Sequence, residues 1–143
     1  MKIKKLNEKA ILPRYMTDGA SGFDLFCYED VKWEVRGGVH VAEVYTGWAF
    51  EVEREHGMFL LSRSGHGRKQ LTHLANCVGL LDFDFRGEAL IILMCHLNVP
   101  PIIKAGTAMA QAVVLETPKM FFEVVDELND TERGKNGFGS AGM

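Results

Sequence analysis

Apolar and polar residues alternate with a period of two along much of the chain, which is typical of strands that bury one face. The alternation is clearest at Val39–Val41 and Trp48–Val52, and Ile3–Leu6 has the charged, alternating character of an edge strand. Met58–Leu61 and Ala89–Val99 are more continuously apolar and predict strands buried on both faces. Many short strands separated by turn signals favour a sandwich, a jelly roll or a barrel.

Four other segments need separate interpretation. Phe121–Val125 is aromatic and β-branched and predicts one more strand. Ala105–Leu115 is rich in Ala, Met and Gln, so propensity alone leaves helix and strand equally open. Ser62–Leu71 is polar and basic, which predicts a loop or one helical turn. The glycine-rich tail Arg133–Gly142 is either a frayed end or a segment that orders over an anionic ligand, with Phe138 as a stacking ring.

Composition narrows the range of functions. The chain has 143 residues, of which 47% are hydrophobic and 24% charged, so one globular domain is expected. Its longest apolar run, Ala89–Cys95, is far shorter than the roughly 20 residues that cross a bilayer, so we expect no membrane span. A net charge of −3 gives no global positive field, and we expect no nucleic-acid partner. An anionic ligand must therefore meet a local cluster of positive groups.

The cysteines and histidines give no sign of a disulfide framework or a metal cage. Cys27, Cys77 and Cys95 are odd in number and widely spaced, so we expect buried free thiols in a reducing cytoplasm. Met1–Leu6 lacks the apolar segment of a secretory signal, so we expect none there. The histidines lack the spacing of a metal site, although His66 is a candidate ligand contact.

Four motifs precede the tail in the chain. Ala20–Leu25 places Asp24 after a glycine near a strand start, and Gly79–Glu88 places acids just past an apolar run. Arg63–Gly65 offers a forked cation, a hydroxyl and a closely approachable backbone, which suit phosphate oxygens. Gly106–Gln111 ends with an amide inside an apolar run. Each motif is weak alone, and only the order and spacing of all five, with the tail, are specific.

In that order the five motifs resemble those of the trimeric dUTP pyrophosphatases (dUTPases), from about Leu12 to Gly142. The resemblance implies an all-β, distorted jelly-roll β-barrel of the β-clip type over residues 1–130, with strand at Ala105–Leu115. It also implies a flexible C-terminal arm, 131–143, which closes over the active site of a neighbouring subunit in a homotrimer with shared sites. The location it implies is the cytoplasm, that of a host cell if the protein is viral.

The implied reaction is attack of water on the α-phosphorus of dUTP, which gives dUMP and pyrophosphate. This limits uracil in DNA and supplies dUMP for dTMP synthesis. Asp82 matches the catalytic acid that orients and deprotonates the water, because a carboxylate accepts from both partners. Asp84, two residues on, is the weaker candidate, because we expect its side chain to point to the other face. Gln111 matches a contact to the α-phosphate and the water.

The resemblance also implies the cofactor and the substrate contacts. Asp24 acts on Mg²⁺ through water, while the triphosphate holds most of the ion. The implied contacts to dUTP are Asn76, Leu80 and Leu81 on uracil, Phe85 on deoxyribose, Arg63, Ser64 and Gly65 on the phosphates, Arg133 on the γ-phosphate, Phe138 stacked on uracil, and Gly139 and Ser140 on the terminal phosphates.

Several positions depart from the family pattern, and these departures bear on affinity and rate. This chain has Ser62 where the family usually has Pro, His66–Gly67 where it has Leu-Ala, and Phe85 where it has Tyr. It also has Ala108 in place of Arg and Ala141 in place of Thr. Two alternatives stay open. One is a dCTP deaminase on the same fold, whose phosphate motif runs Ser-Ser after the arginine instead of Ser64–Gly65. The other is a dUTPase-like trimer that binds nucleotide and signals to a protein partner, with or without turnover.

Overall fold

Strands dominate the computed structural model, which describes residues 1–137. In chain order the elements are β1 (Lys2–Lys5), β2 (Phe23–Phe26), β3 (Glu34–Arg36), β4 (Val39–Glu51), β5 (His56–Ser62), α1 (Ser64–Gln70), β6 (Thr72–Leu74), β7 (Gly79–Leu81), β8 (Glu88–Cys95) and β9 (Ala108–Glu116). Among these residues no helix is long and apolar enough to span a membrane.

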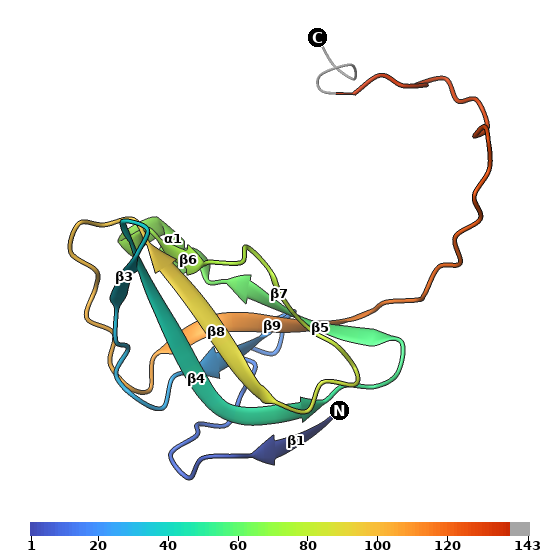
Figure 1. Cartoon of the computed structure of the whole chain (residues 1–143). Helices are drawn as coiled ribbons and strands as arrows, with labels where there is room; N and C mark the ends of the chain where they lie inside the picture. Colours follow the sequence, from blue (N-terminus) through green and yellow to red (C-terminus); the bar gives the residue numbers. More distant parts are fainter. Residues whose placement is uncertain (138–143) are drawn as a thin grey trace.

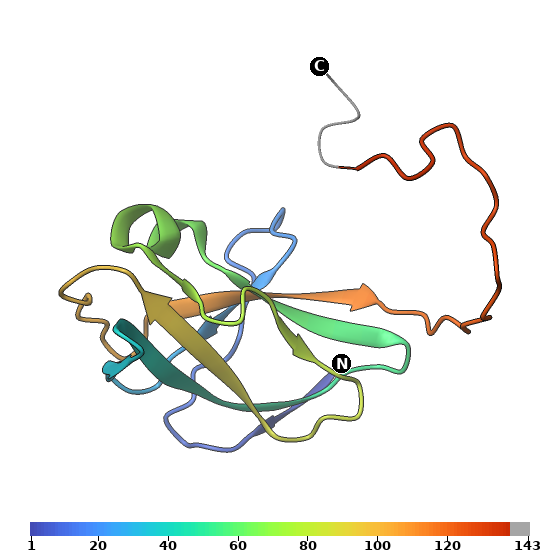
Figure 2. The ribbon, with the colours of Figure 1, turned by 45° about the horizontal axis from the view of Figure 1, so that its top comes forward.

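Two antiparallel sheets form the body of the molecule (Figures 1 and 2). The first, sheet A, has the order β1-β4-β8-β6, with β3 also paired to β4. The second, sheet B, has the order β2-β9-β5-β7. Non-consecutive neighbours in both sheets are typical of jelly-roll connections, so the predicted all-β, jelly-roll class is confirmed.

The core lies between the two sheets, and β8 supplies alternate residues to it. In β8, Ala89, Ile91 and Leu93 are buried in the core, whereas the residues between them are only partly covered. The prediction that Ala89–Val99 and Met58–Leu61 are buried on both faces is therefore wrong for the single chain. No layer of the described residues covers the outer face of either strand fully, and β8 ends at Cys95.

One long strand, β4, replaces the two predicted at Val39–Val41 and Trp48–Val52. The backbone at Gly47 has φ +75°, and the pairing with β8 shifts register there. The Gly47 N–H donates to the Glu88 carboxylate at 2.6 Å, which satisfies an amide that the shift leaves unpaired. A Cβ at Gly47 would lie 2.4 Å from the Cβ of Ala10, so the bend requires glycine.

The ambiguous segment Ala105–Leu115 forms strand β9, as the resemblance implied. It pairs with β2 on one side and β5 on the other, and this pairing overrides helix propensity. Phe121–Val125 forms no strand, so that prediction is wrong. Its residues are largely exposed and have no neighbouring strand in the described chain, and β-propensity acts only on a partly buried, paired segment.

The remaining local predictions meet mixed outcomes. Ser62–Leu71 contains the seven-residue helix α1, longer than the one turn expected, and the residue after the helix, Leu71, has φ +45°. Cys27 and Cys95 are buried free thiols as predicted. Cys77 is exposed, so its predicted burial is wrong. It occupies a tight turn with φ +62°, outside the core.

Candidate active site

Three strands of sheet B bring Asp24, Gln111 and Leu61 into one row. Asp24 of β2 lies opposite Gln111 of β9, which lies opposite Leu61 of β5. Their chain neighbours, such as Leu25 and Ala110, are completely buried in the core. Because side chains alternate along strands, this row belongs to the outer face of sheet B.

Arg63 joins this row from the residue that precedes α1. Its Nη2 donates to Asp24 Oδ2 at 3.1 Å, and its Nη1 donates to the carbonyl of Ala108 at 3.0 Å. Asp24 is 1% exposed, whereas the Arg63 side chain is 30% exposed. The fork of the guanidinium is therefore fixed on its inner side, while donors remain on the outer side for an anion.

The second oxygen of Asp24, Oδ1, is buried and has no hydrogen-bond partner. An unpaired buried carboxylate oxygen is costly, so it indicates a polar group that the carboxylate receives. Carboxylate oxygen suits Mg²⁺ and its water ligands. Within residues 1–137, however, no group of three or more His, Cys, Asp or Glu could hold a metal ion. The described chain can assist a metal there but not enclose one.

Ser64 and Gly65 open α1 on the exposed side of Arg63. A Cβ built at Gly65 would meet no atom within 4 Å, so the space in front of this turn is open. His66 follows, partly buried, with its Nδ1 buried and unpartnered. Burial, reinforced by the charge of Arg63 and opposed by Asp24, lowers the pKa of His66 below its ordinary 6.5. A neutral imidazole therefore stands beside the ion pair at neutral pH.

Ser62 has a structural role that its departure from the family pattern did not reveal. Its Oγ accepts a hydrogen bond from the N–H of Leu74 at 2.9 Å. This bond ties the end of β5 to β6, on either side of α1. The loop that carries Arg63 is thereby fixed at both ends.

The predicted uracil hairpin lies at the edge of sheet B. In β7, Leu80 lies opposite Phe59 and Leu81 opposite Met58. Leu80 is 54% exposed, whereas Leu81 is 8% exposed, so Leu81 can offer only its backbone to a ligand. Asn76 is exposed in the preceding turn.

Asp82 and Asp84 lie in a turn, because the N–H of Phe85 donates to the carbonyl of Asp82 at 3.1 Å. Both acids line one depression of about 550 Å³, so the prediction that they point to opposite faces is wrong. Residues two apart in a strand share a face, so alternation did not support that prediction, and in this turn both acids also line one depression. The depression is lined by Arg54, Glu55, His56, Asp82, Phe83, Asp84, Thr117, Pro118, Lys119 and Phe121.

The sequence did not predict the two cations that line the depression beside Asp82. The guanidinium of Arg54 lies 5.4 Å from the ring centre of Phe83, and the ammonium of Lys119 lies 5.9 Å from it. Neither residue belongs to a motif, because they come from the turn before β5 and the segment after β9. Only the fold brings them together.

Phe85 presents an exposed ring next to this turn. The ring is 43% exposed, and a Cβ at Gly87 would lie 2.5 Å from its Cζ. The glycine therefore leaves room for the far edge of the ring. Arg86 Nη1 donates to the carbonyls of Phe83 and Phe85, at 2.6 and 3.0 Å, and so fixes the turn.

The Arg63 cluster and the Asp82 turn lie far apart within one chain. Leu81 is opposite Met58 in an antiparallel pair, so Asp82 is level with Gly57, and Arg63 follows Gly57 by six positions along the chain (63 − 57). At about 3.3 Å per residue, the two groups are separated by roughly 20 Å along the strand. One chain therefore does not bring them onto the same phosphate group.

The tail contributes to neither cluster in the described chain. Residues 118–137 are exposed, and Figure 1 shows this segment leaving the sheets after β9. Arg133 Nε donates to the carbonyl of Asn136 at 2.9 Å, a bond within the tail. Phe138, Gly139 and Ser140 lie outside the described residues.

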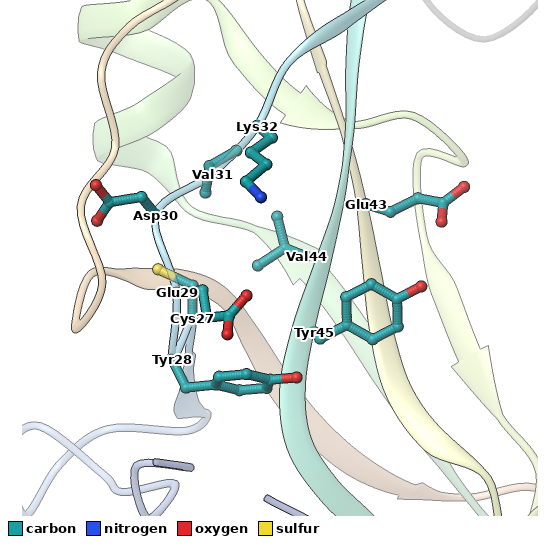
Figure 3. A pocket seen from close by; sticks show the side chains of 9 residues that line it. All are labelled: Cys27, Tyr28, Glu29, Asp30, Val31, Lys32, Glu43, Val44 and Tyr45. Carbon is teal, nitrogen blue, oxygen red and sulfur yellow. The ribbon is translucent and has the colours of Figure 1, made fainter.

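A separate pocket of about 200 Å³ lies between Cys27–Lys32 and the middle of β4, Glu43–Tyr45 (Figure 3). It contains none of the predicted site residues. Its volume is below the roughly 300–1,000 Å³ typical of small-molecule sites. The two clusters on sheet B are therefore the stronger candidates for a ligand site.

The chain is similar in sequence to known proteins over almost its whole length. The dUTPase family model matches residues 8–142. A deoxyuridine 5'-triphosphate nucleotidohydrolase of Nautilia profundicola is 41% identical over 142 residues, which cover 99% of this chain and 98% of that protein. The protein of the same name from Helicobacter hepaticus is 41% identical over 145 residues, with coverages of 100% and 89%.

Solved structures agree with the fold. The Staphylococcus bacteriophage 80alpha dUTPase, described with dUPNHPP, has a TM-score of 0.79 at 21% identity, covering 99% of this chain and 98% of that one. A mutant dUTPase from phage phi11 of S. aureus, described with a structural Mg(II) ion, has a TM-score of 0.78 at 20% identity, with coverages of 90% and 98%. Both show the same arrangement of strands.

Proposed function

The chain belongs to the dUTPase family, and from this premise we propose that it hydrolyses dUTP to dUMP and pyrophosphate. Such an activity limits uracil incorporation into DNA and supplies dUMP for dTMP synthesis. The observation that carries the proposal is the fixed Arg63 guanidinium, held by Asp24 and the Ala108 carbonyl beside Gln111. This is a preformed anion site at the position that the family motifs give to the phosphates.

Asp82 is our candidate for the general base. It accepts a proton from the water that attacks the α-phosphorus and also accepts from the sugar 3′-hydroxyl. Gln111, on the outer face of sheet B, orients the same water and contacts the α-phosphate. Arg63, Ser64 and Gly65 hold the phosphate oxygens in line with the water, so catalysis consists of positioning and charge stabilisation.

The residues present fit Mg²⁺ as a partner of the triphosphate. The orphaned Oδ1 of Asp24 is an oxygen acceptor, and the described chain has no ligand cage that would favour another metal at this site. Bound Mg²⁺ would neutralise charge on the phosphate oxygens. Asp24 would accept hydrogen bonds from its water ligands, while Arg63 keeps the carboxylate in place.

We propose that β7 and the turn after it select the base and the sugar. The backbone of Leu80 and Leu81, with Asn76, reads the uracil edge, and a reversed donor pattern on cytosine leaves buried groups unpaired. The exposed ring of Phe85 packs on deoxyribose and leaves no space for a 2′-hydroxyl.

A homotrimer with shared sites is part of the proposal, because the separation of roughly 20 Å between Asp82 and Arg63 needs a second chain to close it. Two surfaces support this assembly. The outer face of β8 carries the partly buried apolar residues Leu90, Ile92 and Met94. The segment after β9 exposes Phe121 at 102% and Phe122 at 96%, which is unusual for an isolated chain.

We propose further that residues 1–130 act as the barrel and 131–143 as an arm that covers a neighbour's site. In this arrangement Arg133 meets the γ-phosphate, Phe138 stacks on uracil, and Gly139 and Ser140 donate to the terminal phosphates. Closure excludes water and strengthens the charge contacts inside. The free thiols and the nucleotide substrate support a cytoplasmic location.

The direct test is pyrophosphate release with Mg²⁺ and four nucleotides, dUTP, dCTP, dTTP and UTP. We expect rapid release from dUTP, and release lower by about 10⁴-fold where the hydrogen-bond pattern is reversed, as in dCTP. Ammonia release from dCTP would instead identify a deaminase. An assembled protein that leaves dUTP intact in Mg²⁺ would refute the proposal.

A further inference from the structure

The imidazoles of His73 and His96 form a close pair that no family motif includes. Their Nε2 atoms lie 2.9 Å apart, and the contact is exposed. The ring centres are 5.1 Å apart with planes inclined by 25°. Because the nitrogens are so much closer than the centres, the nitrogen edges of the two rings face each other.

Backbone pairing fixes both side chains in sheet A. His73 lies in β6, opposite Met94 of β8. His96 follows β8 directly, and its N–H donates to the carbonyl of Leu71 at 3.2 Å. The two imidazoles are therefore carried by neighbouring ordered segments, which gives the pair a defined geometry. Sheet B carries the substrate clusters, so this pair is separate from them.

A further hydrogen bond sets the chemistry of the His73 ring. Its Nδ1 lies 2.9 Å from the carbonyl oxygen of Leu74. A carbonyl oxygen only accepts, so Nδ1 carries the hydrogen and Nε2 has a free lone pair. Histidines that bind metals typically donate their other ring N–H to a carbonyl in this way, which orients the ring.

We propose that His73 and His96 chelate a late first-row divalent metal ion, of the class of Zn²⁺, Ni²⁺ and Cu²⁺. With metal–nitrogen bonds of about 2.0–2.1 Å, two nitrogens at the observed separation subtend an angle of roughly 90° at the metal. Each ring turns by roughly 45° so that both lone pairs converge on the metal, and the hydrogen on His96 Nε2 moves to Nδ1 by tautomerisation. Water completes the coordination, because residues 1–137 offer no third ligand at the pair.

The donor set separates this site from the nucleotide site. Imidazole nitrogen favours late transition metals, whereas Mg²⁺ prefers oxygen ligands and keeps its water. The chelate would join β6 to the end of β8, at the edge of sheet A. Its expected consequence is a metal-dependent gain in stability, without any requirement for nucleotide.

Calorimetric titration of the tag-free full chain with Ni²⁺, without nucleotide and in a non-chelating buffer, tests the site. Wild type should bind one Ni²⁺ per chain. His73→Asn and His96→Asn should each weaken binding by about tenfold or more, because one of two ligands is lost. His56→Asn, at a partly buried histidine that begins β5 in the other sheet, is the matched control and should bind Ni²⁺ as wild type does. Mg²⁺ should not compete.

Thermal unfolding gives an independent readout. Ni²⁺ should raise the Tm of wild type and His56→Asn but not that of either pair variant. Hydrolysis of dUTP with Mg²⁺ shows that the two pair variants are folded, since neither His73 nor His96 belongs to the proposed active site. Wild type that binds no Ni²⁺ at millimolar concentration, or pair variants that retain the wild-type affinity, would overturn the proposal.

Discussion

At the scale of single residues, the proposed reaction depends on two charged groups that lie in different surroundings. Arg63 is held from two directions, by Asp24 and by the Ala108 carbonyl. Asp82 lies in a turn and lines an open depression with Asp84. The fixed cation suits binding and the accessible carboxylate suits proton transfer, so substitutions should separate the two roles.

Replacing Asp82 tests the base. Asp82→Asn keeps the shape and removes the proton acceptor, so kcat for dUTP should fall by about 10²–10⁴-fold, the usual contribution of a general base. Binding of a non-hydrolysable dUTP analogue should change only a few-fold. Asp84→Asn is the matched control, because Asp84 lines the same depression. Near-full turnover in Asp82→Asn would exclude Asp82 as the base.

Replacing Arg63 tests the anion site. Lysine keeps the charge but has no planar fork, so Arg63→Lys cannot donate to Asp24 and the Ala108 carbonyl while also presenting donors outward. We expect KM for dUTP to rise by about tenfold, which corresponds to roughly one charge-assisted hydrogen bond. A KM equal to that of wild type would show that the fork is not used for the substrate.

His66 gives the folded chain a defined pH dependence. Its pKa is lowered by burial and by Arg63, so between that pKa and the ordinary 6.5 the unfolded chain binds a proton that the folded chain does not. Stability should therefore fall as pH decreases from above 6.5 through this window, because protonation favours the unfolded chain. Denaturant unfolding from pH 7.5 to 5.5 measures the slope. His66→Gln should reduce it, and an unchanged slope would contradict the assignment.

The site residues that lie in motifs could be predicted from the sequence, but the residues that they contact could not. Asp24 and Arg63 were both predicted site residues, yet nothing in their spacing indicates that they form an ion pair. Arg54 and Lys119 were not predicted at all, because the depression that they line forms only when β5 and β9 pair. Partners that are distant in sequence depend on strand register, which single motifs do not encode.

At the scale of elements, the bend in β4 depends on Gly47. Gly47→Ala adds a Cβ that would lie 2.4 Å from the Ala10 Cβ at a φ of +75°. Gly38→Ala is the matched control, because its φ is +82° but no atom lies within 4 Å. The control should lose about 1–2 kcal/mol from the positive φ alone, and Gly47→Ala about 1–3 kcal/mol more from overpacking.

Chemical unfolding at one fixed protein concentration measures both glycine variants, since assembly couples stability to concentration. Equal losses in the two variants would show that the contact with Ala10 does not matter.

Element predictions succeeded where a pattern coincided with pairing inside the chain. Alternation located β1 and both ends of β4, and family resemblance resolved β9 against its helix-forming composition. The same reasoning failed at Phe121–Val125, which has the composition of a strand without a neighbour to pair with in the described chain. It also overestimated the burial of β8, whose outer face no second layer of this chain covers.

At the scale of the whole molecule, the tail should be needed for turnover but not for assembly. A chain that ends at Glu132 lacks Arg133, Phe138, Gly139 and Ser140, the four tail residues to which the proposal gives substrate contacts. Light scattering should give the same mass as for the full chain, while kcat falls by at least about a hundredfold because the substrate is no longer enclosed. Full turnover in the truncated chain would remove the arm from the mechanism.

The most direct test of the account is complementation between two inactive variants, Asp82→Asn and Arg63→Ala, co-expressed so that they form mixed assemblies. If each site takes Asp82 from one chain and Arg63 from another, roughly a quarter of the sites in random mixtures contain both native residues. Pyrophosphate release from dUTP should then return to about that fraction of the wild-type rate. A mixture that stays as inactive as the separate variants would contradict a site shared between chains.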